Sequence, residues 1–201
     1  MNEALTEDRN DAGNLNPQTD FQIVPKIGLY FVAVVLVALV TAIATNSLWA
    51  IDFFHVVGGA SWTILDLFLG FVLGPILGKL SIPARAEFTK RFMPKMLLIM
   101  PTVVLCTLAA GFQLARHQGR LLAHYHLHPW LIASYIVVAI MALVALGLLE
   151  PANVAVLFEL KKPIPNGEVI GKLMKRFIYS AGVTGAMQIV TLVIMTKLAT
   201  S

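Results

Sequence analysis

Charged residues are scarce in this chain of 201 residues: Asp, Glu, Lys and Arg make up 13% of it, whereas 58% is apolar. A soluble domain usually carries about 25% charged residues, so this chain has too few to cover a water-exposed surface. A single cysteine, Cys106, excludes an intrachain disulfide and a Cys-x-x-Cys pair. Neither a phosphate-binding glycine fingerprint nor a Gly-x-Ser-x-Gly elbow occurs, which argues against nucleotide-dependent and serine-hydrolase chemistry. These absences predict a membrane protein.

The chain contains several long apolar stretches. Each is about as long as the roughly 20 residues that cross a bilayer as a helix, and none shows the alternation of a barrel strand. We therefore predict an all-α polytopic membrane helix bundle of five transmembrane helices, a four-helix core plus an additional N-terminal span. Residues 1–25 are expected to form a flexible polar tail before a single transmembrane domain, 26–201. The predicted spans are about 27–48, 51–79, 92–115, 130–150 and 169–197.

Lysine and arginine are unevenly divided between the two sides of these spans. Twelve fall on one side and three on the other, and basic residues in short loops stay in the cytoplasm. We expect a plasma (inner) membrane protein with a cytoplasmic N-terminus and an extracytoplasmic C-terminus. Because the basic residues form no continuous patch, we expect the lipid bilayer and not nucleic acid as partner. The cytoplasmic set is Arg9, Lys26, Lys79, Arg85, Lys90, Arg91, Lys95, Lys161, Lys162, Lys172, Lys175 and Arg176; the other is Arg116, Arg120 and Lys197.

The second span carries polar residues at a depth that lipid excludes. At about 100° per residue, His55, Trp62 and Asp66 share one face of a helix. A charged side chain at the centre of a spanning helix costs about 2.5–3.5 kcal/mol and by default marks a functional site. Two interpretations of Asp66 stay open: a proton-transfer or ligand-binding group, or a structural residue that is paired with Lys95 or kept protonated by burial.

The five histidines all fall on the predicted extracytoplasmic side. His55 lies near that end of the second span, His117 ends the third, and His124, His126 and His128 lie in the following loop. Neutral imidazole is a ligand of haem iron, copper and zinc, so His55, His117 and His128 are candidate metal ligands. The alternative is that the loop histidines, His124 and His126 above all, are merely solvated.

Glycines flank the candidate ligand and also mark packing surfaces. Gly58 and Gly59 follow His55 closely, and the missing side chains would admit either a flat macrocycle or another helix. The spacing of Gly70, Gly74 and Gly78 predicts a second surface for close helix contact. In the fifth span, a small and polar surface is expected to make similar contacts within the bundle or with another subunit. That surface consists of Ser180, Gly182, Gly185 and Gln188.

The segment "HVVGGASW" resembles the start of the HemJ-type protoporphyrinogen oxidases and of the related copper-resistance D-like integral membrane proteins. The resemblance covers roughly 53–115. It implies a compact helix bundle in which His55 matches the haem-associated histidine and Trp62 the tryptophan that follows. "KRFMPKMLLIMPTVVLCTLAAG" is similar to the family's basic segment before a proline-containing helix, where Lys95 takes the place of its lysine. "FVLGPILGKL" is closer to the copper-resistance D-like branch than to the HemJ branch.

Two functions follow as expectations. The first is a haem b protein for electron transfer or oxidoreductase-like chemistry, with His55, Gly58, Gly59, Trp62 and Lys95 forming the cofactor site and quinone or another membrane subunit as partner. The second is a copper- or other metal-handling membrane protein, or a non-enzymatic subunit of a membrane complex. The sequence identifies no catalytic residue and no reaction.

Overall fold

The computed structural model describes residues 22–119 and 129–200, and these residues contain helices and no strand. The prediction of an all-α bundle is confirmed. Two of the helices are interrupted by short π-helical segments, labelled η. The elements are α2 (Lys26–Ala44), α3 (Leu48–Leu67), η1 (Phe68–Leu73), α4 (Gly74–Lys79), α5 (Ile82–His117), α6 (Pro129–Val144), η2 (Ala145–Leu149), α7 (Glu150–Leu160) and α8 (Gly167–Thr200).

Five helical units in the described residues are long and apolar enough to cross a membrane, as expected for a multi-pass membrane protein. The third starts at Ile82 and not near Phe92, and the fourth continues through Pro151 to Leu160. Hydropathy marks only the apolar part of a helix, whereas the backbone hydrogen bonds continue through the polar residues beyond it. The four longer units have 32–36 residues, or about 50 Å at 1.5 Å per residue, so they exceed the roughly 30 Å of a hydrocarbon core.

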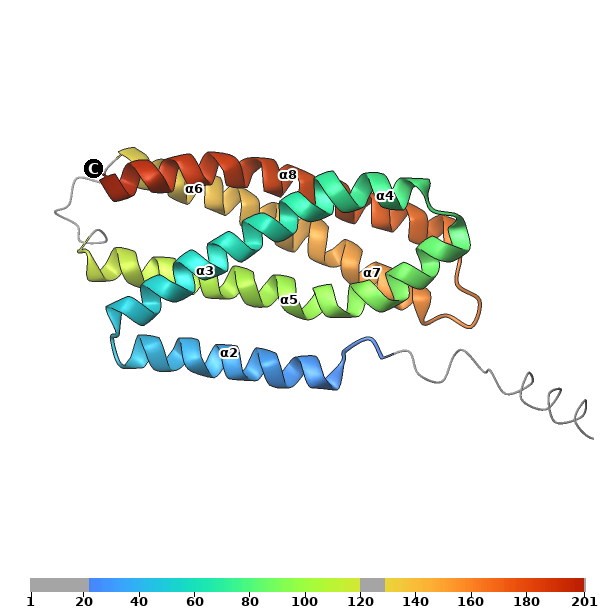
Figure 1. Ribbon diagram of the computed structural model, residues 1–201, viewed down its shortest axis with the longest axis horizontal. Helices are drawn as coiled ribbons and strands as arrows, with labels where there is room; N and C mark the ends of the chain where they lie inside the picture. Colours follow the sequence, from blue (N-terminus) through green and yellow to red (C-terminus); the bar gives the residue numbers. More distant parts are fainter. Residues whose placement is uncertain (1–21, 120–128, 201) are drawn as a thin grey trace, which may run out of the picture.

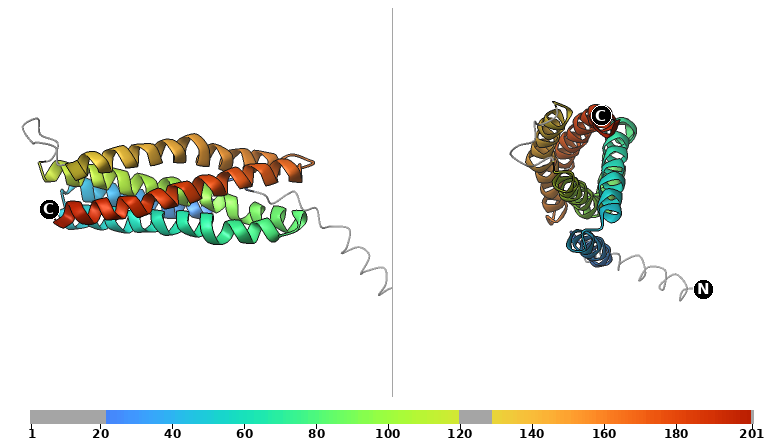
Figure 2. Two further views of the ribbon diagram at one scale, coloured as in Figure 1. Left: turned by 90° about the horizontal axis from the view of Figure 1, so that it is seen from above. Right: turned by 90° about the vertical axis from the view of Figure 1, so that its left-hand side faces the viewer.

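Four units surround the core, and α2 lies outside it (Figures 1 and 2). The view along the bundle in Figure 2 shows α2 apart from the ring formed by α3–α4, α5, α6–α7 and α8. α2 contacts α5 and one end of α3, and only Leu39 and Ala42 of its side chains are buried. The predicted division into a four-helix core and an additional first span is therefore observed.

The two ends of the bundle differ in charge. We call the end that carries the α4–α5 and α7–α8 connections the basic end, because Lys79, Arg85, Lys161 and Lys162 lie there. At this end the core helices extend beyond the start of α2 (Figure 1).

A helix cap is present in the α7–α8 connection, where the Asn166 side-chain oxygen accepts hydrogen bonds from the backbone N–H groups of Glu168 and Val169.

Both π-helical segments end just before a proline. η1 is followed by Gly74 and Pro75, and η2 by Glu150 and Pro151. A proline inside a helix provides no N–H donor and its ring collides with the preceding turn, so a wider turn relieves the collision. Pro75 is thus accompanied by a π turn in the segment before it. Pro101 lies within the uninterrupted helix α5.

α3 crosses the bundle diagonally and changes neighbours along its length (Figure 1). Its first half packs on α5, where Gly58 faces Thr107, and its second half continues onto α8, where Gly70 faces the backbone of Gly182. The small surface predicted in α8 thus makes its helix contacts inside the bundle. Of the three glycines spaced by four, Gly70 and Gly74 face α8, whereas Gly78 faces open space.

Candidate functional site

A cluster of buried polar side chains lies between α3 and α8, and Asp66 is its only acid. Asp66 is fully buried at 0% exposure, in a helix that is apolar enough to cross a membrane. Both of its carboxyl oxygens lack a hydrogen-bond partner among the described residues. Because an unpartnered buried polar group costs free energy, an aspartate in this position calls for a specific explanation.

Two donors face the Asp66 carboxyl group. The Thr184 hydroxyl and the Trp62 indole are directed toward it, but neither reaches the geometry of a hydrogen bond. Thr184 bonds instead to backbone carbonyl oxygens of its own helix, at 3.1 Å from Ser180 and 3.0 Å from Ala181. A small rotation or shift would let either donor reach the carboxyl group.

A second polar pair continues the cluster toward the end opposite the basic end. The Thr63 hydroxyl lies 3.2 Å from the side-chain oxygen of Gln188 and 2.8 Å from the backbone carbonyl oxygen of Gly59, so its one hydrogen is shared between two acceptors. Both Thr63 and Gln188 are buried. The amide nitrogen of Gln188 has no hydrogen-bond partner among the residues that the structure describes. Since Ser180, Thr184 and Gln188 are spaced by four residues, they form one polar stripe on α8 that faces α3.

Trp62 and Asp66 therefore lie where the sequence predicts, inside the bundle. Trp62 is 2% exposed, and its indole nitrogen also lacks a hydrogen-bond partner in the described segments. Together the α3–α8 cluster offers one acid and the N–H donors of Trp62 and Gln188. Such a set can hold a proton on the acid or bind a small polar molecule that has both acceptor and donor groups.

The suggested ion pair between Asp66 and Lys95 is not formed. The three ion pairs among the described residues involve neither of them, and Lys95 is exposed. The diagonal course of α3 explains the difference, because it carries Asp66 onto α8. Lys95 instead lines a groove on the side of α5 that faces α2.

His55 lies on the same face of α3 as Trp62 and Asp66 but meets a different helix. Its Nδ1 donates a hydrogen bond to the backbone carbonyl oxygen of Thr107 on α5, at 2.9 Å. A Cβ atom at Gly111 would lie 2.7 Å from Cε1 of the imidazole. The ring is thus half-buried in a notch on α5 that only a glycine leaves open.

The glycines next to His55 serve helix packing. A Cβ atom at Gly58 would lie 2.7 Å from the Thr107 hydroxyl, and one at Gly59 would lie 3.5 Å from the Thr107 methyl group. Of the two alternatives that the sequence left open, the close approach of another helix is the one observed.

Only one of the remaining candidate ligands, His117, lies within the described residues. His117 is exposed in the last turn of α5, and His124, His126 and His128 lie outside the described residues. Across 22–119 and 129–200, no three His, Cys, Asp or Glu side chains come close enough to hold a metal ion.

Asn153 is one of the buried polar residues that the sequence pattern did not reveal. It lies on α7 with 0% exposure, and neither its side-chain oxygen nor its nitrogen has a partner within the described part of the chain. Its position after Pro151, in a segment that we expected to lie beyond the fourth span, hid the signal. A helix continued through Pro151 would have placed Asn153 among the apolar residues of the core.

Comparison with known proteins leaves the resemblance to the HemJ-type and copper-resistance D-like proteins as a prediction. No family model, no curated protein and no solved structure matches this chain.

Proposed function

We propose that this multi-pass membrane protein handles protons inside its helix bundle, and that Asp66 is the group that binds and releases the proton. The observation that carries the proposal is the complete burial of an acid whose oxygens have no partner among the described residues. Acids inside membrane spans that face the bundle interior are typical of proton relays in pumps and transporters.

A protonated, neutral Asp66 explains the site better than an ionised Asp66 paired with a cation does. None of the three ion pairs supplies Asp66 with a cation, and an ionised carboxylate in an apolar interior costs several kcal/mol unless it is paired. The protonated acid is neutral and costs less. The donors of Thr184 and Trp62 face the carboxyl group, so a small movement of α8 against α3 would stabilise the ionised form and release the proton.

Infrared difference spectroscopy of the protein in lipid tests the proposal. We expect the C=O stretch of a protonated carboxylic acid that lies out of water, and we expect Asp66→Asn to remove it. Glu87→Gln is the matched control because Glu87 is exposed and paired with Arg91, so this variant should keep the band. A wild-type spectrum without the band over the whole accessible pH range would contradict the proposal.

A second candidate is haem b ligated by the Nε2 atom of His55, as the family resemblance implies. The observation that favours it is the Nδ1–Thr107 hydrogen bond, because metal-ligating histidines usually donate their other ring N–H to a carbonyl or carboxylate. When bound, haem would supply one-electron redox chemistry. The packing of Gly58 and Gly59 against Thr107 offers it no support.

An absorption spectrum of protein purified from haem-supplemented cells tests this second candidate. We expect a Soret band that His55→Ala removes and His117→Ala retains. A colourless wild-type protein would leave the polar cluster as the remaining candidate site. The alternatives of copper handling and of a quinone or subunit partner stay predictions, since the histidine loop lies outside the described residues.

A further inference from the structure

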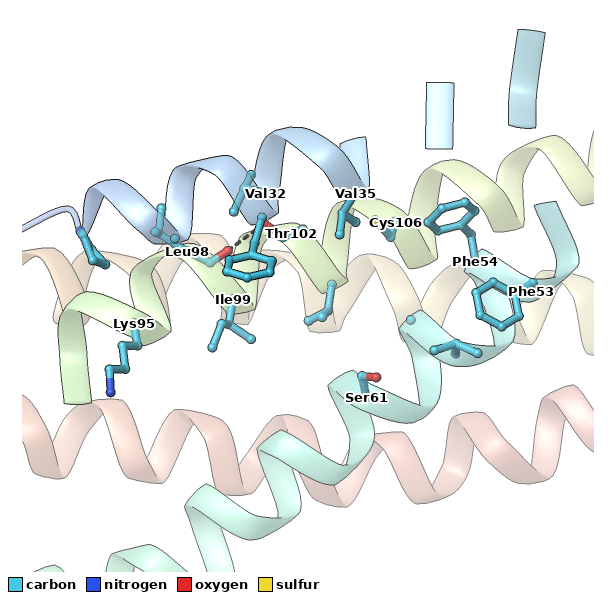
Figure 3. A pocket seen from close by; sticks show the side chains of 16 residues that line it. Val32, Val35, Phe53, Phe54, Ser61, Lys95, Leu98, Ile99, Thr102 and Cys106 are labelled. Carbon is cyan, nitrogen blue, oxygen red and sulfur yellow. Dashed lines mark hydrogen bonds between the residues drawn. The ribbon is translucent and has the colours of Figure 1, made fainter. Parts of the chain in front are cut away.

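An apolar groove of about 540 Å³ lies between α2, α3 and α5 (Figure 3). Val32 and Val35 line it from α2, Phe53 and Ser61 from α3, and Ile99 and Thr102 from α5. Its volume is that of a site for a drug-sized ligand or part of a lipid. The groove is separate from the α3–α8 cluster and does not include His55 or Asp66.

The diagonal course of α3 creates this groove. Near the end opposite the basic end, α2 and α3 are joined by a short connection and share a small core with α5 that contains Leu39, Ile51 and Cys106. Toward the basic end α3 leaves α2 and moves to α8 (Figure 1). α2 remains on α5, where Gly28 faces Leu98, so the space that α3 vacates lies open at the side of the bundle.

Basic side chains surround the end of the groove that lies toward the basic end. A second hollow of about 350 Å³ shares Pro25 and Lys95 with the groove and is also lined by Glu87, Lys90 and Arg91. Glu87 forms an ion pair with Arg91 at 2.7 Å, so its charge is compensated. Lys95 is exposed and belongs to none of the ion pairs among residues 22–119 and 129–200. Among the described residues, the positive charge of Lys95 at the mouth is therefore not balanced by an ion pair.

The position of Lys95 along α5 matches the edge of a hydrocarbon core. From Lys95 to His117 the helix has about 22 residues, or roughly 33 Å, close to the thickness that lipid tails occupy. Before Lys95 the helix carries charged residues, among them Arg85, Glu87 and Arg91. Lys95 thus marks one end of the apolar stretch of α5, and the apolar groove extends from it along the helices (Figure 3).

We propose that this groove binds an anionic phospholipid, with one acyl chain along α2, α3 and α5 and the phosphate group at Lys95. In a bilayer, lipid tails reach the apolar walls of the groove through its side opening. A tail that fills the groove remains in an apolar environment. The Lys95 ammonium group, which forms no ion pair within 22–119 and 129–200, favours a lipid with net negative charge over a zwitterionic one. On the predicted orientation the bound lipid belongs to the cytoplasmic leaflet, where anionic lipids are concentrated.

Native mass spectrometry of the full-length protein, titrated with phosphatidylglycerol or phosphatidylcholine in mixed micelles, tests this. We expect the wild type to retain phosphatidylglycerol preferentially, and Lys95→Gln to weaken that retention about fivefold. Lys79→Gln removes a basic residue of the same end that lines neither hollow, so it should leave the preference unchanged. Equal retention of the two lipids by the wild type would overturn the proposal.

Two variants test the groove itself. Ser61→Phe from α3 and Ile99→Phe from α5 place a ring in the space meant for the acyl chain, and each should lower retention of both lipids. Having two variants on different helices guards against the failure of one to fold, which the elution profile of the purified protein reveals. Unchanged lipid retention in a folded Ser61→Phe or Ile99→Phe variant would overturn the proposal. So would a quinone that co-purifies in place of phospholipid, or a dimer whose interface covers the groove through α2 and α3.

Discussion

Gly185 on α8 lies against the backbone of Asp66 on α3, so that a Cβ atom at position 185 would be 3.1 Å from the carbonyl carbon of Asp66. The same line of close contact continues at Gly70, which faces the backbone of Gly182. Helices approach this closely in membranes where side chains are small. Asp66 therefore lies in the interface between α3 and α8, where the close spacing of the two helices depends on glycine.

The first prediction concerns this interface. Gly70→Ala should lower the free energy of unfolding by about 1–3 kcal/mol, because the new Cβ would overlap backbone atoms of Gly182. Gly78→Ala is the matched control, since no atom lies within 4 Å of a Cβ at that position, and it should be neutral or stabilising by up to about 1 kcal/mol. Thermal unfolding in detergent measures both. Equal stability of the two variants would contradict the observed packing.

The second prediction concerns the charge state of Asp66. Asparagine has nearly the shape of a protonated aspartic acid, so Asp66→Asn should change the free energy of unfolding by less than about 1 kcal/mol. An ionised and paired aspartate would instead lose about 3–5 kcal/mol. Asp52→Asn, at an exposed position of the same helix, controls for the substitution itself. Denaturation of the purified protein distinguishes the two cases.

The third prediction concerns the hydrogen bond between Thr63 and Gln188. A double-mutant cycle with Thr63→Val and Gln188→Met should give a coupling free energy of about 0.6 kcal/mol and at most about 1.7 kcal/mol, the range of hydrogen bonds between membrane helices. The bond joins α3 to α8, so the coupling should appear in global unfolding. Additive effects of the two substitutions would show that the bond contributes nothing.

The fourth prediction concerns the start of α8. Asn166→Ala removes the oxygen that accepts from the N–H groups of Glu168 and Val169, and it should cost about 1 kcal/mol. Asn166→Asp keeps a capping oxygen and should retain the stability of the wild type. The measurement is thermal unfolding, with amide hydrogen exchange at 168–170 reporting the local opening. Faster exchange in the aspartate variant than in the alanine variant would refute the cap.

Sequence by itself determined the membrane class, the number of spans and the interior face of the second one. Apolar length and helical periodicity are local properties, so they identified five spans and aligned Trp62 with Asp66. The same local signal placed the start of the third span too late and the end of the fourth span too early, and it missed Asn153. Hydropathy responds to composition, whereas a helix continues through polar residues as long as its backbone bonds can form.

Only the tertiary structure decided which helix each polar residue meets. His55 and Asp66 share one face, yet the diagonal course of α3 places the first against α5 and the second against α8. The same crossing separates Asp66 from Lys95 and leaves a groove beside α2. Crossing angles depend on contacts between residues far apart in the chain, such as Gly70 with Gly182, and no pattern within one helix contains that information.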